Sequence, residues 1–382
     1  MVSVTSQLRA IIRPLAVTCI IVLFFVFLFN YNLSSYRSEN SISYVALGLI
    51  GKTSEASSVL GNATPKMLAE IKTNASEIEQ LTNVVPRVEK KLIELCPLVS
   101  PKLVGWTNIT SEMKEALLKI DQVQVEFKMK EAGLGIGGRY EPIECRSRNK
   151  VAIVVPYRDR KDHLTVFLHY LHPFLQRQQL NYVIIIVEQS AGTPFNRGML
   201  MNIGFNEAQL QETFQCFIFH DVDFLPEDDS NPYTCPEDGR PRQMSFSIDY
   251  WDNYKPTPRS HFGGVTALST ADFQRINGYS NSFWGWGGED DQLFQRVKFN
   301  NLTVVRAFDE QPLLVHKARY KTQSHQKAQP NPDRKQVLAE GNVRFKTDGL
   351  FDLKYKRLNL QFKPLYTHIL VDIQQPGPII KS

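Results

Sequence analysis

The chain has 382 residues, with 44 Lys and Arg against 39 Asp and Glu, a net charge of +5 and five cysteines. This length excludes a mini-protein held together only by disulfides, and a hydrophobic fraction of 42% excludes global disorder. The slightly negative mean hydropathy excludes a polytopic membrane protein. A small net charge without a long basic run argues against a nucleic-acid partner.

An uncharged apolar block follows Arg9 and Arg13 near the N-terminus and covers residues 15–33. Its length is close to the ~20 residues that cross a bilayer as a helix. Because basic residues stay on the cytosolic side, we predict a cytosolic tail at 1–14, a signal anchor at 15–33 and a lumenal C-terminal part. A cleaved signal peptide is the alternative, but it needs a shorter apolar region and a small-residue cleavage site.

Two further features indicate a lumenal chain. Sequons follow the apolar block, and we predict glycosylation at four of them: Asn62, Asn74, Asn108 and Asn301. Four of the five cysteines also follow the block: Cys96, Cys145, Cys216 and Cys235. In an oxidising compartment they predict two disulfides, with three pairings open. Free thiols in a cytosolic enzyme are the alternative, which fits the sequons less well.

Residues 34–95 are poor in aromatics and rich in Ser, Asn, Glu and Lys, which is typical of a stem. From residue 65 onwards, apolar residues recur every three or four positions until Pro86 interrupts them. A short oligomerising helix, giving a homodimer through the stem, is one interpretation. A helix packed on the catalytic domain, or a spacer, is the other.

From residue 96 onwards the sequence becomes globular, and we predict one domain over 96–382. Strands are expected at Lys150–Pro156, Asn181–Glu188 and Cys216–Phe224, with helices at Leu164–Gln178 and Arg197–Gln211 between them. This alternation predicts a doubly wound α/β sheet whose ligands bind at the carboxyl ends of the strands. The phosphate-binding motifs of P-loop and dinucleotide enzymes do not occur.

Asp221 and Asp223 come at the end of the third predicted strand. The period of a strand would place both carboxylates on one face, where Mg²⁺ or Mn²⁺ could bridge them to a diphosphate. A lone D-x-D is more often a solvated turn, but this one follows an apolar strand. Arginines follow the first two strands in Pro156-Tyr-Arg-Asp-Arg160 and Phe195-Asn-Arg197, and they suit a diphosphate.

The segment Phe283-Trp-Gly-Trp-Gly-Gly-Glu-Asp-Asp291 combines two tryptophans, three glycines and three acids. The glycines permit close backbone approach to a ligand, and the tryptophan faces suit sugar rings. The acids would supply a general base or hold hydroxyl groups. A turn that caps a helix, with the acids in its first turn, is the alternative, but it leaves the tryptophans unexplained.

Together with Phe262-Gly-Gly-Val265 and Pro364-Leu-Tyr-Thr367, these motifs resemble the β-1,4-galactosyltransferase family of Golgi type II glycosyltransferases over about residues 95–375. The resemblance implies a GT-A fold, which is a Rossmann-like mixed sheet. It also implies a UDP-sugar donor, Mn²⁺, inversion at the anomeric carbon and a location in the Golgi membrane with the catalytic domain in the lumen.

The resemblance also implies residue roles. Asp290 would be the general base with Glu289 beside it, and Asp223 would bind the metal. Donor contacts would be Arg158, Arg160, Phe195, Arg197, Asp221, Val222, Gly264 and Trp286, the last in a mobile loop. Acceptor contacts would be Gly288, Asp291 and Arg334. The implied disulfides are Cys96–Cys145 and Cys216–Cys235.

The metal-binding histidine is expected to be His325, with His316 as the competitor. Thr322 stands where many vertebrate members have a methionine ligand, so metal affinity or preference is expected to differ. His261 stands where galactose-specific members have tyrosine and invertebrate N-acetylgalactosamine-transferring members have a smaller aliphatic residue. In the family's N-acetyl pocket, Lys335 replaces an aromatic residue, which weakens the case for an N-acetylglucosamine acceptor.

The sequence therefore predicts an inverting, Mn²⁺-dependent transfer of galactose from UDP-galactose to the 4-hydroxyl of an acceptor sugar. The expected acceptor is terminal N-acetylglucosamine or glucose on a glycoprotein or glycolipid. The alternatives are transfer of N-acetylgalactosamine, or a catalytically inactive lumenal sugar-binding protein. An inactive protein of this kind would have lost the acidic residues of the site, whereas this sequence keeps all of them: Asp221, Asp223, Glu289, Asp290 and Asp291.

Overall fold

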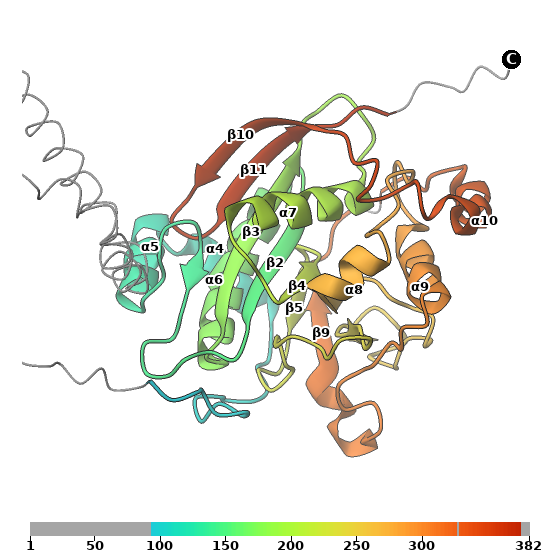
Figure 1. Ribbon diagram of the computed structural model, residues 1–382. Helices are drawn as coiled ribbons and strands as arrows, with labels where there is room; N and C mark the ends of the chain where they lie inside the picture. The colour runs from blue at the N-terminus through green and yellow to red at the C-terminus, as the bar shows by residue number, and fades with distance from the viewer. Residues whose placement is uncertain (1–92, 327, 376–382) are drawn as a thin grey trace, which may run out of the picture. The chain divides into compact units, whose positions relative to one another are not determined.

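The computed structural model describes residues 93–326 and 328–375 (Figure 1). The predicted tail, anchor and stem, and the sequons at Asn62 and Asn74, lie outside these ranges, as does any dimer contact through the stem. Among the residues that are described, none of the helices is long and apolar enough to cross a membrane.

A central mixed sheet of eight strands organises the described chain, in the order β10-β11-β3-β2-β4-β8-β6 with β1 paired to β3. Strands β2, β3, β4 and β11 run parallel to one another, whereas β8 and β10 are antiparallel to their neighbours. The bounds are β1 Arg139–Tyr140, β2 Lys150–Tyr157, β3 Asn181–Gln189, β4 Cys216–His220, β6 Arg242–Gln243, β8 Val265–Ser269, β10 Lys356–Phe362 and β11 Thr367–Asp372.

Helices cover both faces of this sheet, because its central strands are apolar on both sides. Val151, Ile153 and Val155 of β2 pack in one core with helix α6 (Lys161–Arg177). Their neighbours Ala152 and Val154 pack in a second core with helix α7 (Arg197–Gln211), which crosses the sheet in Figure 1. The predicted doubly wound α/β arrangement is confirmed.

The third predicted strand is shorter than expected. It ends at His220, and Asp221 to Asp223 form a turn in which the Phe224 amide donates to the Asp221 carbonyl at 3.2 Å. The chain then enters a separate three-stranded sheet, formed by β5 (Phe224–Pro226), β9 (Arg319–Thr322) and β7 (Ser247–Ile248). The apolar run therefore crosses from one sheet to another instead of forming one strand.

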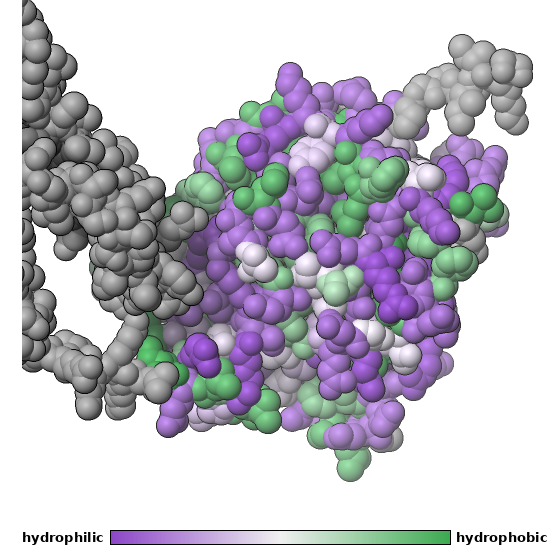
Figure 2. Space-filling view, viewed as in Figure 1, coloured by the Kyte–Doolittle hydropathy of each residue, from purple (hydrophilic) through white to green (hydrophobic). Residues whose placement is uncertain are grey.

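The remaining helices are α4 (Ser111–Lys119), α5 (Gln122–Glu131), α8 (Thr270–Arg275), α9 (Glu289–Phe299), the 3₁₀ helix η3 (Pro312–Ala318) and α10 (Arg334–Arg344). Helix α4 packs on α6. In Figure 1, α5 lies to the left of the sheet and α9 and α10 lie to its right. The face drawn in Figure 2 is mainly hydrophilic, with apolar residues in small separate groups.

Two disulfides are present, Cys96–Cys145 and Cys216–Cys235, as the family resemblance implied. They close loops with sequence separations of 49 and 19 residues. By restricting the unfolded chain, each is expected to contribute about 3–4 kcal/mol to stability.

Candidate active site

The candidate site lies at the carboxyl ends of β2, β3 and β4, where the predicted arginines and aspartates follow each strand. After β2, the Arg158 guanidinium lies 5.2 Å above the Phe195 ring and donates to the Thr193 carbonyl at 2.8 Å. Arg160 lies half-buried at the start of α6. The predicted donor contacts from β2 and β3 are thus neighbours in space.

Arg197 is the centre of the site. Asn196 caps α7 by accepting from the Met199 amide at 2.9 Å, which fixes Arg197 as the first residue of the helix. Its Nε donates to Asp221 at 2.6 Å and its Nη1 to Asp290 at 2.6 Å. The same Nη1 lies 3.6 Å from Glu289. One guanidinium therefore holds carboxylates from two distant segments.

The pKa values of the groups in this cluster are strongly shifted from their ordinary values. Burial raises the pKa of Asp221 to about 7 and that of Glu289 to about 7, and Asp290 adds to both through its charge. Burial opposes the charge on Arg197, but Asp221 and Asp290 raise its pKa well above the ordinary value. The Glu289 Oε2 atom is buried without a hydrogen-bond partner. Such an oxygen suits a hydroxyl donor from a ligand.

Glycines position the acids. Gly288 caps α9 with a φ of +103°, and a Cβ there would lie 2.6 Å from the Phe283 ring. A Cβ on Gly263 would overlap the Asp290 carboxylate. Gly264, with a φ of +73°, accepts from the Asp221 amide at 3.0 Å. The segment before β8 therefore lies directly against both Asp221 and Asp290.

The two tryptophans of the 283–291 motif have different environments. Trp284 is buried, whereas Trp286 is 59% exposed. Trp286 pairs through its backbone with residues 329–331, and the Arg334 guanidinium lies 5.8 Å from its ring. Asp291 lies exposed in the first turn of α9. Trp286 and Gly288 thus lie beside Arg334. The roles of these residues and of Asp291, and the mobility of the Trp286 loop, stay predictions.

The expected metal ligands are close together. His325 Nε2 lies 2.9 Å from Asp223 Oδ2, because the Gln323 amide donates to the Asp223 carbonyl at 2.8 Å. Two ligands about 2.1 Å from one cation at a right angle would lie about 3 Å apart, so the pair fits a divalent metal. His316 lies exposed in η3. Of the two candidate histidines, His325 is the one beside Asp223.

The prediction that Asp221 and Asp223 share one strand face is wrong. The turn after β4 directs Asp221 to Arg197 and Asp223 to His325. Thr322, which was expected to replace a methionine ligand, donates its hydroxyl to Asp249 at 2.7 Å. Over residues 93–326 and 328–375, no three His, Cys, Asp or Glu side chains form a metal-binding group. A metal bound by Asp223 and His325 would therefore need further ligands of another kind, which a diphosphate could supply.

Two aromatic residues of the site were not predicted. Tyr250 and Trp251 follow β7 in a turn where Asp252, Asn253 and Tyr254 all have positive φ. The Trp251 ring lies 6.3 Å from the His261 ring at an interplanar angle of 29°. Burial lowers the pKa of His261, while Asp290 opposes this shift. Two adjacent aromatics between acidic residues at 249–252 were a signal that could have found them.

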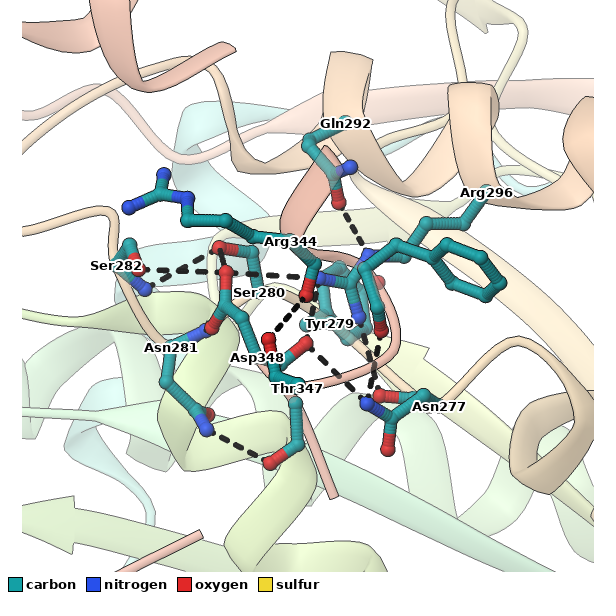
Figure 3. A network of polar contacts seen from close by, with 12 residues as sticks. Asn277, Tyr279, Ser280, Asn281, Ser282, Gln292, Arg296, Arg344, Thr347 and Asp348 are labelled. Atoms are coloured by element: carbon teal, nitrogen blue, oxygen red, sulfur yellow. Dashed lines mark hydrogen bonds and ion pairs between the residues drawn. The ribbon is translucent and has the colours of Figure 1, made fainter. Parts of the chain in front are cut away.

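A buried polar network fixes α9 from behind (Figure 3). Arg296, buried in α9, donates to the carbonyls of Asn277 at 3.1 Å, Gly278 at 3.0 Å and Asp348 at 2.7 Å. The Asp348 carboxylate accepts from the Asn281 amide at 2.7 Å. The network joins α9 to the segment before the glycine-tryptophan motif and to the segment after α10. It holds the helix that carries Glu289 and Asp290.

Two family models match the chain. The N-terminal region of glycosyl transferase group 7 matches residues 96–236, and the N-terminal domain of galactosyltransferase matches residues 242–326. The first range carries the arginines and Asp221 to Asp223, and the second carries the glycine-tryptophan motif and His325.

Relatives match most of the chain. β-1,4-Galactosyltransferase 1 from Homo sapiens is 41% identical over 299 residues, 78% of this chain and 72% of the relative. β-1,4-Galactosyltransferase 4 from Cricetulus griseus is 40% identical over 287 residues, 75% of this chain and 79% of the relative.

A crystal structure of a Drosophila β-1,4-galactosyltransferase 7 mutant, in complex with manganese, UDP-Gal and xylobiose, is also similar. It matches with a TM-score of 0.51 and 26% identity, over 59% of this chain and 94% of that chain. The described residues therefore adopt a mixed α/β glycosyltransferase fold. Together with the family models and the relatives, this shows that the chain belongs to the β-1,4-galactosyltransferase family.

Proposed function

We propose that this chain transfers galactose from UDP-galactose to a hydroxyl of an acceptor sugar, with Mn²⁺ and with inversion at the anomeric carbon. The observation that carries the proposal is Arg197 holding both Asp221 and Asp290 at 2.6 Å. Asp221 is two residues from the candidate metal ligand Asp223, and Asp290 directly follows the glycines and tryptophans of the 283–291 motif, so Arg197 joins the two halves of the candidate site. Donor and acceptor would meet between them.

For the donor, Asp223 and His325 would hold Mn²⁺, and the diphosphate would supply further ligands. When bound, Mn²⁺ would stabilise the negative charge on the departing UDP. Arg158 and Phe195, already in contact with each other, would bind the nucleotide. Arg160, Asp221, Val222 and Gly264 line the same ends of the sheet and would complete the donor contacts.

For the transfer itself, Asp290 would take the proton from the acceptor 4-hydroxyl as its oxygen attacks the anomeric carbon. The bond from that carbon to UDP breaks in the same step, so a single displacement inverts the configuration. Arg197 keeps the Asp290 carboxylate in place for this role. Glu289, whose buried Oε2 has no partner and whose pKa is about 7, would hold a sugar hydroxyl.

For the acceptor, the exposed face of Trp251 would stack on the sugar, while Trp286 would close over the donor as the family resemblance implies. Gly288, Asp291 and Arg334 would complete the acceptor contacts. The acceptor would be terminal N-acetylglucosamine or glucose. Transfer of N-acetylgalactosamine is a second candidate reaction, because His261, at the family's donor-selecting position, matches neither donor pattern.

We also infer the arrangement of the whole chain in the cell. Residues 1–14 would be a cytosolic tail, 15–33 an anchor, 34–95 a stem and 96–382 the catalytic domain in the Golgi lumen. Two disulfides, which form in oxidising compartments, support a lumenal domain. Asn108 and Asn301 are exposed and would be glycosylated together with Asn62 and Asn74. The stem would carry any homodimer contact.

The direct test measures UDP release and product formation with UDP-galactose, UDP-N-acetylgalactosamine and UDP-glucose over a panel of acceptor sugars, with Mn²⁺ or with a chelator. We expect transfer from UDP-galactose that requires both Mn²⁺ and an acceptor. Faster transfer from UDP-N-acetylgalactosamine would establish the second candidate reaction. Sugar binding without turnover of any donor would contradict both.

A further inference from the structure

A basic pocket lies along α9, the helix that carries Asp290 and Asp291. Its cavity of about 140 Å³ is lined by Arg259, Phe294, Lys298, Thr303, Val304 and Arg306. These residues come from the segment before β8, from α9 and from the chain that follows α9. Cations from three segments therefore converge on one cavity with Phe294 and Val304 as its apolar part.

The charge of this basic pocket is only partly compensated. Arg259 pairs with Asp309 at 2.5 Å, whereas no ion pair between described residues involves Lys298 or Arg306. Arg306 donates to the Thr257 carbonyl at 2.9 Å and lies 5.0 Å from the Phe246 ring, so its guanidinium is fixed in place. Burial and the neighbouring Arg259 lower the pKa of Arg306, although the Asp309 carboxylate opposes this shift, so its guanidinium is partly desolvated beside another cation. A bound anion would stabilise it.

The position of the basic pocket relates it to the acceptor. One face of α9 carries three of the residues concerned, because they are spaced three and four positions apart: Asp291, Phe294 and Lys298. The helical rise places Phe294 about 4.5 Å and Lys298 about 10 Å along the axis from Asp291. The His261 amide donates to the Pro258 carbonyl at 2.9 Å, so Arg259 and His261 share one tight turn. The pocket thus begins beside the acceptor contacts.

We propose that the basic pocket is an acceptor subsite for an acidic group, a carboxylate or a sulfate ester, on the part of the acceptor beyond the sugar that receives galactose. This inference rests on the proposed function, because it takes Asp291 as an acceptor contact. The cations bind the acidic group by charge-assisted hydrogen bonds. Phe294 and Val304 pack against the ring that carries it.

The test uses three disaccharide acceptors that share the best terminal sugar of the acceptor panel. Their second sugar is glucose, glucuronate or a sulfated glucose. We expect the purified protein to have a KM about tenfold lower for both acidic acceptors, the effect of one charge-assisted hydrogen bond, with kcat unchanged. A preference for only one of them would identify which acidic group the pocket takes.

Two variants assign the preference to the pocket. One variant is Lys298→Gln, and the other combines Lys298→Gln with Arg259→Gln. Both should lose the preference for acidic acceptors and keep the KM for the glucose acceptor. Lys128→Gln, an exposed lysine on α5, is the matched control and should keep the preference. Equal KM values for all three acceptors in the native protein, or a preference that survives in the double variant, would overturn the proposal.

Equilibrium binding separates this proposal from the proposed function. The three disaccharides are titrated in the presence of UDP and Mn²⁺, with tryptophan fluorescence as the signal. Tighter binding of the acidic acceptors that Lys298→Gln abolishes supports the pocket even if no galactose is transferred. Absence of transfer would then count against the proposed function alone, and equal dissociation constants would count against the pocket.

Discussion

Replacement of Arg197 by glutamine should destabilise the protein in a pH-dependent way. The guanidinium makes two hydrogen bonds of 2.6 Å to carboxylates and lies 3.6 Å from a third. Each charge-assisted bond is worth about 1.5–3 kcal/mol, and breaking a buried pair costs about 3–5 kcal/mol. We therefore expect a loss of about 4 kcal/mol at pH 8.

The loss should be smaller at low pH. Without the guanidinium, the pKa values of Asp221 and Glu289 rise above the value of about 7 that burial already gives them. The folded variant then binds more protons than its unfolded chain, so its stability falls as the pH rises from about 5 to about 8. At pH 5.5 the carboxyl groups are protonated, and we expect a loss of about 1–2 kcal/mol.

Urea unfolding followed by tryptophan fluorescence, without donor or metal, measures both values. Arg197→Lys is the matched control, because it keeps the charge but loses the simultaneous contact with Asp221 and Asp290. Arg197→Lys should lose less unfolding free energy than Arg197→Gln, and its loss should depend less on pH. An equal loss for Arg197→Gln at pH 5.5 and pH 8 would refute the view that the guanidinium acts by neutralising buried carboxylates.

Three further predictions follow from the same contacts. His325→Ala should raise the Mn²⁺ concentration for half-maximal activity about 10- to 100-fold, whereas His316→Ala should leave it unchanged. Folding raises the pKa of Glu289 from its ordinary value of 4.5 to about 7, so the native protein loses stability as the pH rises from about 5 to about 7. Glu289→Gln lacks this ionisation and should become more stable than the native protein over that range, by up to about 3 kcal/mol. Chemical unfolding of both proteins at each pH measures the difference in their free energies of unfolding. Arg296→Met should lower the free energy of unfolding by about 3–4 kcal/mol, since it leaves the carbonyls of Gly278 and Asp348 without this donor; urea unfolding checks it.

Much of the fold could be predicted because its central strands are buried on both faces. Continuous apolar runs located β2 and β3 to within one residue, and α7 has the predicted bounds. The run from Cys216 to Phe224 was misjudged because burial alone does not reveal which sheet a strand joins. Phe224 pairs with Thr322, a partner that sequence patterns do not identify.

The site was predictable where charged residues follow buried strands, as Arg197 and Asp221 do. The link from Arg197 to Asp290 depends on the glycines before β8 and α9, which allow the carboxylate to lie against bare backbone. The Arg296 network could not be predicted, because most of its acceptors are backbone carbonyls and these carry no residue-specific signal. Tyr250 and Trp251 belong to no motif of the family resemblance, and only their adjacency marks them in the sequence.

The rate of galactose transfer by Asp290→Asn tests the central claim most directly. The variant keeps the size of the side chain and an oxygen that can accept from Arg197, but it cannot take a proton. We expect transfer to fall by at least about 100-fold, with the affinity for UDP-galactose and Mn²⁺ retained. Transfer at the native rate would contradict the assignment of Asp290 as the general base and the mechanism built on it.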